Sequence, residues 1–190
     1  MEGPYIEDKL FDKIIFAEKP LQQGDYEYCR FVDCDLSYAD LSGYHFTECS
    51  FTGCNLAMAK LQKTSLNGAQ FKECKLMGLH FEDCDSVLFA VNFDHCQLDF
   101  SSFFQLKMKK TLFSYCSLKE ADFTETDLSA SVFEHCDLVR AIFQQTLLEK
   151  TDLRTSFHYS IDPARNALKK TKVSSAGLTG FLDQYDLDIE

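Results

Sequence analysis

The chain has 190 residues, of which 45% are hydrophobic, so it can build a sizeable core and is not expected to be disordered. Its formal net charge of −11 disfavours direct binding to phosphate backbones and favours a basic partner, or one that normally holds nucleic acid. The mixed-charge N-terminus lacks the apolar segment of a secretory signal, and the apolar runs are too short to span a bilayer. We therefore expect a soluble, cytoplasmic protein.

Residues 1–28 are expected to form a degenerate N-terminal coil that caps a repeat array. Large apolar residues recur there every five residues, at Phe11, Phe16, Leu21 and Tyr26. Lys9 and Lys19, however, occupy positions that the later repeats give to small residues. Terminal repeats of solenoids are usually atypical in this way.

A hexapeptide of the form Phe-x-x-Cys-x-Leu recurs about every twenty residues. It reads FVDCDL from Phe31, FTGCNL from Phe51, FKECKL from Phe71, FDHCQL from Phe93, FSYCSL from Phe113 and FEHCDL from Phe133. A finer period of five lies within it, with a large apolar residue at every fifth position and a usually smaller residue two positions earlier. Internal repetition of this kind predicts a solenoid.

A period of five fits neither a helix nor a flat strand. Five residues advance roughly 500° on an α-helix, and an odd step on a strand reverses the side chain's face. The large residues all point inward only if the backbone turns a corner about once per five residues. Four corners then close a coil of twenty residues, which matches the hexapeptide spacing and predicts an all-β solenoid.

The spacing increases to 22 residues once, between Phe71 and Phe93. We interpret this as a local bulge that preserves the stacking. The expected organisation is a first repeat block over residues 29–84, a two-residue register slip over 85–87 and a second block over 88–157. Leu88 is expected to resume the inward column.

All nine cysteines fall at the inward small position. Cysteines stacked one coil apart have parallel Cβ vectors, which suits a disulfide poorly, and those five residues apart lie on different walls, which suits a zinc site poorly. We expect buried, reduced thiols, no bound metal and no cofactor. The chain contains no nucleophile elbow, phosphate loop or metal-ligand motif, so it is not expected to be an enzyme.

Residues 158–190 are expected to form a short α-helical cap and a dimerisation tail. Asp162 before Pro163 is a helix-start signal and predicts a helix over about 163–170. Helical spacing of apolar residues predicts a second helix over about 175–185. Its apolar residues either cover the last coil or pair with a second copy; the candidate dimer interface is Leu178, Phe181, Leu182, Tyr185, Leu187 and Ile189.

Two segments rich in acidic residues and without a basic residue lie between Lys75 and Lys107 and between Lys119 and Arg140. We take from them a candidate partner-binding surface made of Glu82, Asp83, Asp85, Asp94, Asp99, Glu125 and Glu134. Residues 25–160 carry 20 acidic and 12 basic residues, which is less than half the charge density of a duplex of equal length. Mimicry of DNA therefore requires the charge to be concentrated on one or two faces; otherwise this is an ordinary solvated surface.

Segments such as CDLSYADLSG (34–43) and EADFTETDLSAS (120–131) resemble the pentapeptide-repeat family over about residues 29–153. The resemblance implies a right-handed quadrilateral β-helix. The irregularity near Cys84 and the tail are similar to the Qnr-type quinolone-resistance and microcin-immunity branch, although Qnr-type members often carry longer projecting loops.

That branch implies a non-enzymatic, acidic rod that imitates duplex DNA, dimerises through its C-terminal tail and binds a type II topoisomerase such as DNA gyrase. The function expected from the resemblance is protection of gyrase from quinolones or a peptide toxin. The alternative is a structural or adaptor scaffold for an unrelated protein partner. No direct nucleic-acid binding and no membrane association are expected.

Overall fold

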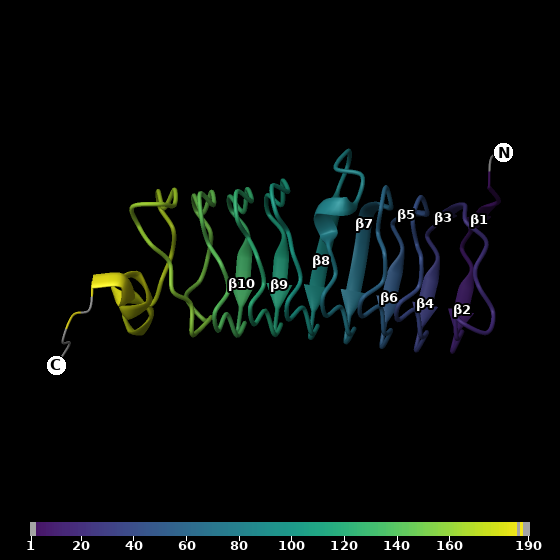
Figure 1. Ribbon diagram of the computed structural model, residues 1–190, viewed down its shortest axis with the longest axis horizontal. Coiled ribbons are helices and arrows are strands. Elements are labelled where there is room, and N and C mark those ends of the chain that lie inside the picture. Colours follow the sequence, from purple (N-terminus) through teal and green to yellow (C-terminus); the bar gives the residue numbers. More distant parts are fainter. Residues whose placement is uncertain (1–2, 186, 188–190) are drawn as a thin grey trace.

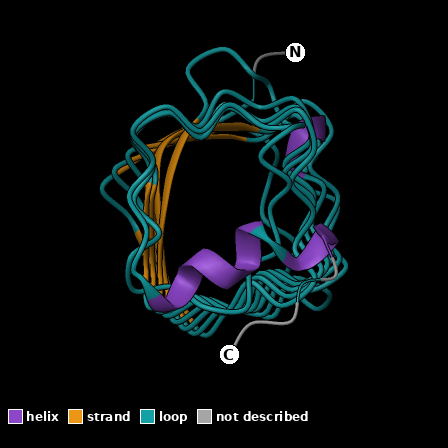
Figure 2. Ribbon diagram, turned by 90° about the vertical axis from the view of Figure 1, so that its left-hand side faces the viewer, coloured by secondary structure: helices purple, strands orange, loops and turns teal. Residues whose placement is uncertain are grey.

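The computed structural model describes residues 3–185 and Leu187, and in it the chain winds into a rod with four walls (Figures 1 and 2). Every strand pair in the described part of the chain is parallel. Partners lie 20 residues apart, as in Phe31 with Phe51 and Phe113 with Phe133, except between β7 and β8, where the register slip makes the spacing 22 or 23. The expected right-handed quadrilateral β-helix is confirmed.

The strands are short and occupy two adjacent walls (Figure 2). They are β1 (Tyr5–Glu7), β2 (Leu10–Asp12), β3 (Asp25–Glu27), β4 (Arg30–Val32), β5 (His45–Thr47), β6 (Ser50–Thr52), β7 (Ser65–Lys72), β8 (Ala90–Asp94), β9 (Leu112–Ser114) and β10 (Val132–Glu134). Strand β7 turns the corner between the two walls, because its first half pairs with β5 and its second half with β6. The other two walls are held by isolated parallel bridges, such as Asp40 with Lys60.

We label the walls A to D in chain order. Wall A begins with β1, β3 and β5 and comprises residues 5–8, 25–28, 45–48, 65–68, 85–90, 107–110, 127–130, 147–150 and 167–170. In each four-residue stretch the second residue, such as Tyr26, points inward and the others form the outer face. Wall B carries the Phe31-to-Phe133 stack, wall C the stack beginning Leu36 and Leu56, and wall D the stack beginning Leu41 and Leu61.

The corners are made by residues in the left-handed backbone region. The second residue after most inward large residues has a positive φ, for example 59° at Gln105 and 54° at Gln145; the corner after Phe81 is an exception. Its N–H donates to a carbonyl of the next coil, as from Gln105 to Thr124 at 3.0 Å. This backbone reversal lets an odd step of five residues return each large side chain to the interior.

The interior is filled by ladders of like side chains. The rings of Phe93 and Phe113 lie 5.2 Å apart and those of Phe113 and Phe133 lie 4.6 Å apart, both nearly parallel. Across the corner, Phe113 meets Phe123 edge-on at 6.0 Å. These rings are fully buried, so each coil completes the core of its neighbours.

The small inward residues fill the corners and also bond to the backbone. Thr126 Oγ1 donates to the carbonyl of Phe103 at 2.8 Å, and Cys136 Sγ to that of Phe113 at 3.4 Å. Both partners lie 23 residues earlier, on the preceding coil. All nine cysteines are buried and unpaired, as expected.

The register slip forms a projecting loop over residues 86–89, seen above β7 and β8 in Figure 1. Asp85 N still donates to Thr64 O at 2.9 Å, and regular pairing returns with Ala69 and Val91. The expected inward position of Leu88 is wrong, because its side chain is 69% exposed. Phe89 packs against the core instead.

The C-terminal region differs from the expected α-helical cap. The segment 163–170 is not a helix but part of a further coil, because Ala167 bridges to Leu147 and Lys172 to Asp152. The cap itself consists of two 3-10 helices, η2 (Ala176–Phe181) and η3 (Asp183–Tyr185), where an α-helix was expected. A third 3-10 helix, η1 (Phe81–Asp83), precedes the projecting loop.

Candidate functional site

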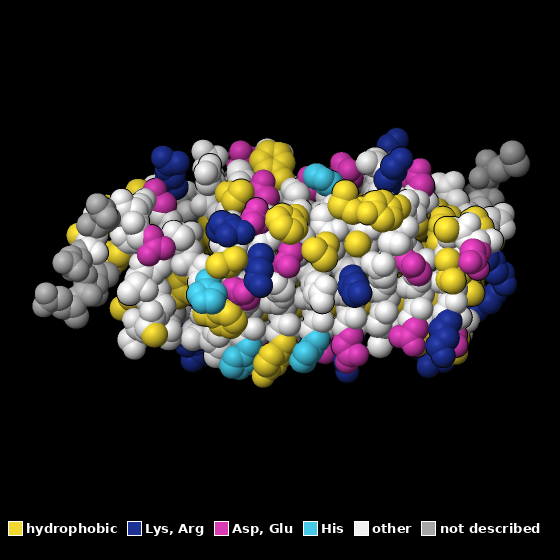
Figure 3. Space-filling view, turned by 60° about the horizontal axis from the view of Figure 1, so that its bottom comes forward, with side chains coloured by type: hydrophobic (Ala, Val, Ile, Leu, Met, Phe, Trp, Pro, Cys, Tyr) yellow, Lys and Arg dark blue, Asp and Glu magenta, His cyan; other side chains and the backbone are white. Residues whose placement is uncertain are grey.

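The seven acidic residues predicted as a partner-binding surface are spread over all four walls. Glu82, Asp83 and Glu125 lie on wall D, Asp94 and Glu134 on wall B, Asp99 on wall C and Asp85 on wall A. The structure therefore does not bring them together in one stripe. Figure 3 shows acidic and basic side chains interspersed along one face of the rod.

Several other carboxylates are paired with basic side chains. Asp137 lies 3.4 Å from Lys119, Glu120 is bonded to Arg140, and the Arg154 Nη2 atom lies 2.8 Å from Asp152. The hydrogen bonds and charge of Arg154 hold the pKa of Asp152 below its usual range. Such acidic residues have little charge left to offer a partner.

One part of the surface differs from this mixture. The N-terminal half of wall A carries six carboxylates, which we call the acidic half-wall: Glu7, Asp8, Asp25, Glu27, Glu48 and Asp85. The described outward positions of wall A from Tyr5 to Asp85 include no Lys or Arg. The parallel pairing of β1, β3 and β5 brings these residues onto one wall and stacks Glu7 directly on Glu27.

The acidic half-wall borders a shallow groove of about 420 Å³ beside the projecting loop. It is lined by Asp25, Glu27, His45, Asp85, Val87 and Leu88, together with Tyr5 and the backbone of neighbouring coils. Val87 N donates to Asp85 Oδ1 at 2.9 Å, which fixes the base of the loop. The groove thus presents carboxylates beside two exposed apolar side chains.

Two contacts within the groove orient its carboxylates. Tyr5 donates its hydroxyl to Glu27 Oε2 at 2.6 Å, and this hydrogen bond is the main cause that raises the pKa of Tyr5 to about 12. His45 Nδ1 lies 2.6 Å from Asp25 Oδ1. Among the described residues, no Lys or Arg lines the groove to neutralise these carboxylates.

Sequence reasoning found only Asp85 of these six residues. The predicted acidic surface was drawn from two continuous segments without a basic residue, and Asp25, Glu27 and Glu48 lie outside both. The signal that finds them is the outward residues of one wall, collected over successive coils.

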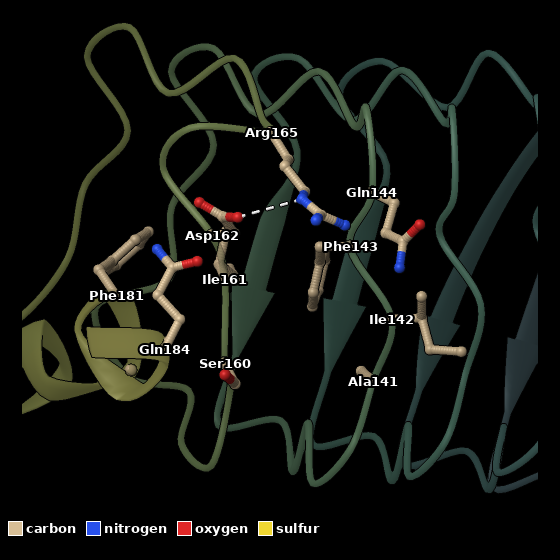
Figure 4. A pocket seen from close by; sticks show the side chains of 11 residues that line it. Ala141, Ile142, Phe143, Gln144, Ser160, Ile161, Asp162, Arg165, Phe181 and Gln184 are labelled. Atoms are coloured by element: carbon tan, nitrogen blue, oxygen red, sulfur yellow. Dashed lines mark ion pairs between the residues drawn. The ribbon is translucent and has the colours of Figure 1, made fainter. Parts of the chain in front are cut away.

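A second cavity, of about 390 Å³, lies between the last coils and the C-terminal cap (Figure 4). Asp162 and Arg165 form an ion pair across its rim at 3.3 Å. Phe181 turns toward the rod and packs edge-on against Tyr159 at 5.6 Å. This cavity is a seam between the rod and its cap.

The candidate dimer residues of the tail divide into two groups. Phe181 and Leu182 are half-buried against the rod, whereas Leu178, Tyr185 and Leu187 are more than half exposed. Ile189 lies outside the described residues.

The described residues offer little for catalysis. Burial raises the pKa of the Cys49 thiol to about 12, which removes it as a nucleophile at neutral pH. His95, Tyr115 and His135 stack on the outside of wall B with ring centroids 4.8 Å apart. Across residues 3–185, no group of three or more His, Cys, Asp or Glu side chains is placed to hold a metal ion.

No helix within residues 3–185 has the length and apolar character needed to cross a bilayer.

Comparisons with known proteins agree with the repeat geometry. Residues 24–87 match a family model described as a pentapeptide repeat region, and residues 116–154 match one described as pentapeptide repeats. Together they cover more than half of the chain, which belongs to the pentapeptide-repeat family. No curated protein matches the chain by sequence.

Among solved structures, the chain is similar to two trypsin-treated variants of QnrB1, described as a plasmid-mediated fluoroquinolone resistance protein. The first is 16% identical, with coverage of 98% of this chain and 97% of that one and a TM-score of 0.64. The second is also 16% identical, with full coverage of both chains and a TM-score of 0.62. HetL, a pentapeptide-repeat protein involved in heterocyst differentiation regulation in the cyanobacterium Nostoc sp., is 17% identical, with 88% and 87% coverage and a TM-score of 0.50. At these identities the likeness shows the fold.

Proposed function

We propose that the protein is a non-enzymatic, cytoplasmic rod that imitates duplex DNA, binds DNA gyrase or a related type II topoisomerase, and protects it from a quinolone or a peptide toxin. The observation that carries this proposal is the acidic half-wall, which concentrates carboxylates on one face with no Lys or Arg among its described outward residues. A surface of this kind fits a site built to bind DNA phosphates.

The charge density of the half-wall supports the idea. Its six carboxylates extend over roughly 20 Å, because successive coils lie about 4.8 Å apart. Duplex DNA carries about 12 charges in roughly 20 Å, counting both strands. A single wall of this rod thus reaches about half of the charge that a duplex distributes around its whole circumference.

Similarity to QnrB1 is a second, weaker support. QnrB1 is described as a fluoroquinolone resistance protein, and the resemblance in fold extends over nearly the full length of both chains. The low identity leaves the partner to be established for this chain by experiment.

The second candidate function is an adaptor scaffold for an unrelated protein. It is favoured by walls B, C and D, where acidic and basic side chains alternate and form ion pairs such as Lys119 with Asp137. On this hypothesis the acidic half-wall binds a basic segment of a partner that is not a topoisomerase.

We also propose that the tail forms a homodimer. Leu178, Tyr185 and Leu187 lie at the end of the rod, are more than half exposed, and give the cap an apolar outer surface. Joining two rods end to end there buries this surface while leaving the walls free.

The test measures binding to purified gyrase and gyrase supercoiling with the wild type and a reversal variant, Glu7→Lys/Asp8→Lys/Asp25→Lys. We expect the wild type to bind at micromolar concentration or below and to alter supercoiling, and the variant to bind at least tenfold more weakly. The matched control is Glu18→Lys/Asp33→Lys/Glu73→Lys, which changes the net charge equally on walls B and C and is expected to retain binding within about threefold.

Absence of both binding and any change in supercoiling at micromolar protein contradicts the topoisomerase proposal. Equal losses in the two variants contradict the acidic half-wall as the contact surface, because net charge alone then explains the binding.

A further inference from the structure

Wall A changes the sign of its charge beyond the projecting loop. Its C-terminal half carries six lysines, which we call the lysine half-wall: Lys107, Lys109, Lys110, Lys150, Lys169 and Lys170. All six are exposed, and only two carboxylates, Asp127 and Glu149, lie among them. In a protein of net charge −11, one wall is thus acidic in its first half and basic in its second.

The lysines are poorly neutralised by the rod itself. Lys109 lies 3.2 Å from Asp127, but among the described residues the other five have no carboxylate within 4.0 Å. Lys150 and Lys170 occupy the same corner on neighbouring coils, and Lys150 N donates to Lys169 O at 3.0 Å. Like charges stacked on neighbouring rungs repel one another.

The acidic half-wall has the same internal repulsion with the opposite sign. Glu7 pairs in register with Glu27, and Asp8 N donates to Glu27 O at 3.0 Å, so three carboxylates lie close together on the first two coils. The isolated rod therefore holds two self-repelling clusters of opposite charge on one flat wall. A single partner that neutralises both clusters must place a basic cluster against the acidic half-wall and an acidic cluster against the lysine half-wall.

The projecting loop lies between the two halves. Val87 and Leu88 are 68% and 69% exposed, the largest apolar exposure on this wall. An interface with an apolar centre and charged ends has the usual anatomy of a specific protein contact.

We propose that wall A pairs with wall A of a second copy of this chain, antiparallel, about a two-fold axis through the projecting loop. This operation places the end that carries Glu7 and Asp8 against the end that carries Lys169 and Lys170. It also places Asp25 opposite the region of Lys150 and brings the two loops together. A two-fold contact uses the same patch on both copies. In this orientation the two end coils of wall A are complementary to those at the opposite end, whereas nearer the middle Glu48 faces Asp127.

The size of the wall sets the strength of the contact. From Tyr5 to Lys170 it spans roughly 40 Å, and five extended residues span roughly 16 Å across it, which together bury on the order of 1,200 Å² over both copies. This is at the lower end of specific interfaces. The pair is therefore a weak, salt-sensitive dimer, separate from the end-to-end contact proposed for the tail, and it covers the acidic half-wall in competition with any other partner.

The test follows the sedimentation velocity of the full chain from 5 to 200 µM in 50 mM and 500 mM NaCl. Two charge-reversal variants are compared, Lys150→Glu/Lys169→Glu/Lys170→Glu and Glu7→Lys/Asp8→Lys/Asp25→Lys. Wall A of the first variant keeps only three lysines, and wall A of the second keeps five carboxylates against nine lysines. The walls become mainly acidic and mainly basic, so each variant alone is expected to lose side-by-side association. An equimolar mixture of the two is expected to associate at least tenfold more tightly than either alone, and 500 mM NaCl to weaken both wild-type and mixed pairs at least tenfold.

The matched control is Lys60→Glu/Lys63→Glu/Lys75→Glu, which gives the same net charge as the first variant but changes walls C and D. It is expected to associate like the wild type. A tail variant, Leu178→Ser/Tyr185→Ser, separates the two contacts and is expected to keep the association that the wall variants lose.

Two results overturn the proposal. One is a wild type that stays monomeric to 200 µM in 50 mM NaCl, together with no association in the mixture. The other is an association that the tail variant abolishes while both wall variants leave it unchanged.

Discussion

At the scale of single residues, the fold depends on a corner that most side chains tolerate poorly. Left-handed backbone costs an ordinary L-residue roughly 1 kcal/mol or more, yet glycine occupies only four of the corners, at Gly43, Gly53, Gly68 and Gly78. The stacked core and the hydrogen bonds between coils hold the remaining corners in place. Corner residues therefore store strain that a substitution can release.

Glycine at a corner is expected to stabilise the protein, whereas glycine one residue earlier is expected to destabilise it. Gln145→Gly relieves the positive φ of 54° and should raise the free energy of unfolding by about 0.5–1 kcal/mol. Gln144→Gly, next to it and also exposed, should lower that free energy by a similar amount, because only its entropic cost remains. Denaturant unfolding of both variants checks the signs; equal signs contradict the corner assignment.

The buried thiols make stability depend on alkaline pH. Burial raises the pKa of Cys49 to about 12, whereas an unfolded thiol titrates near 8.5. Above pH ~8.5 the unfolded chain therefore binds fewer protons than the folded one, and the free energy of unfolding falls as pH rises. Cys49 should account for about 1.4 kcal/mol of this loss per pH unit.

Chemical unfolding of Cys49→Ser at pH 7, 9, 10 and 11 tests this linkage. Serine and threonine already occupy the same inward position at Ser131 and Thr126, where they donate to the preceding coil. The variant should lose less stability than the wild type between pH 9 and 11. Parallel pH profiles of the two proteins contradict a raised pKa at this thiol.

At the scale of elements, each wall is stabilised by the stacking of successive coils, and no single strand buries a core of its own. The strands are mostly three residues long, and each becomes stable only when the next coil covers its large side chain. The repeat coil was predicted well, because the inward positions repeat every five residues with few exceptions.

The predicted α-helical cap was wrong because its sequence signals are not specific to a helix. Asp162 and Pro163 are start signals that a tight turn also satisfies, and Ala167 N bonds to Thr146 O at 3.0 Å, which draws this segment into another coil.

Removing one ring from the Phe stack is expected to weaken the coils on both sides. Phe113 is fully buried between Phe93 and Phe133, so Phe113→Ala should lower the free energy of unfolding by about 3–5 kcal/mol. Phe113→Leu preserves most of the volume and should cost less than about 1.5 kcal/mol. Equilibrium denaturation measures both variants, and a cost for Phe113→Ala below that of Phe113→Leu contradicts the stack.

At the scale of the whole molecule, charges of one sign cluster on residues of successive coils rather than on neighbouring residues of the chain. The acidic half-wall and the lysine half-wall are assembled from segments about twenty residues apart, and the sequence prediction missed both because it selected acidic residues from two continuous segments of the chain. Leu88 was misplaced for the opposite reason, because the five-residue spacing was continued through a loop that leaves the wall. Core positions are constrained by side-chain volume and can be predicted from one sequence. Clusters of surface charge can be recognised only once the register that assigns residues to each wall is known.

Competition with DNA tests the central claim most directly. Gyrase is incubated with a labelled linear duplex at the duplex's dissociation constant, and the protein is added from 0.1 to 100 µM. We expect the wild type to displace more of the duplex as its concentration rises, and Glu7→Lys/Asp8→Lys/Asp25→Lys to require at least tenfold more protein for the same displacement. A wild type that binds gyrase while the duplex stays bound throughout the titration contradicts the claim that the acidic half-wall takes the place of DNA.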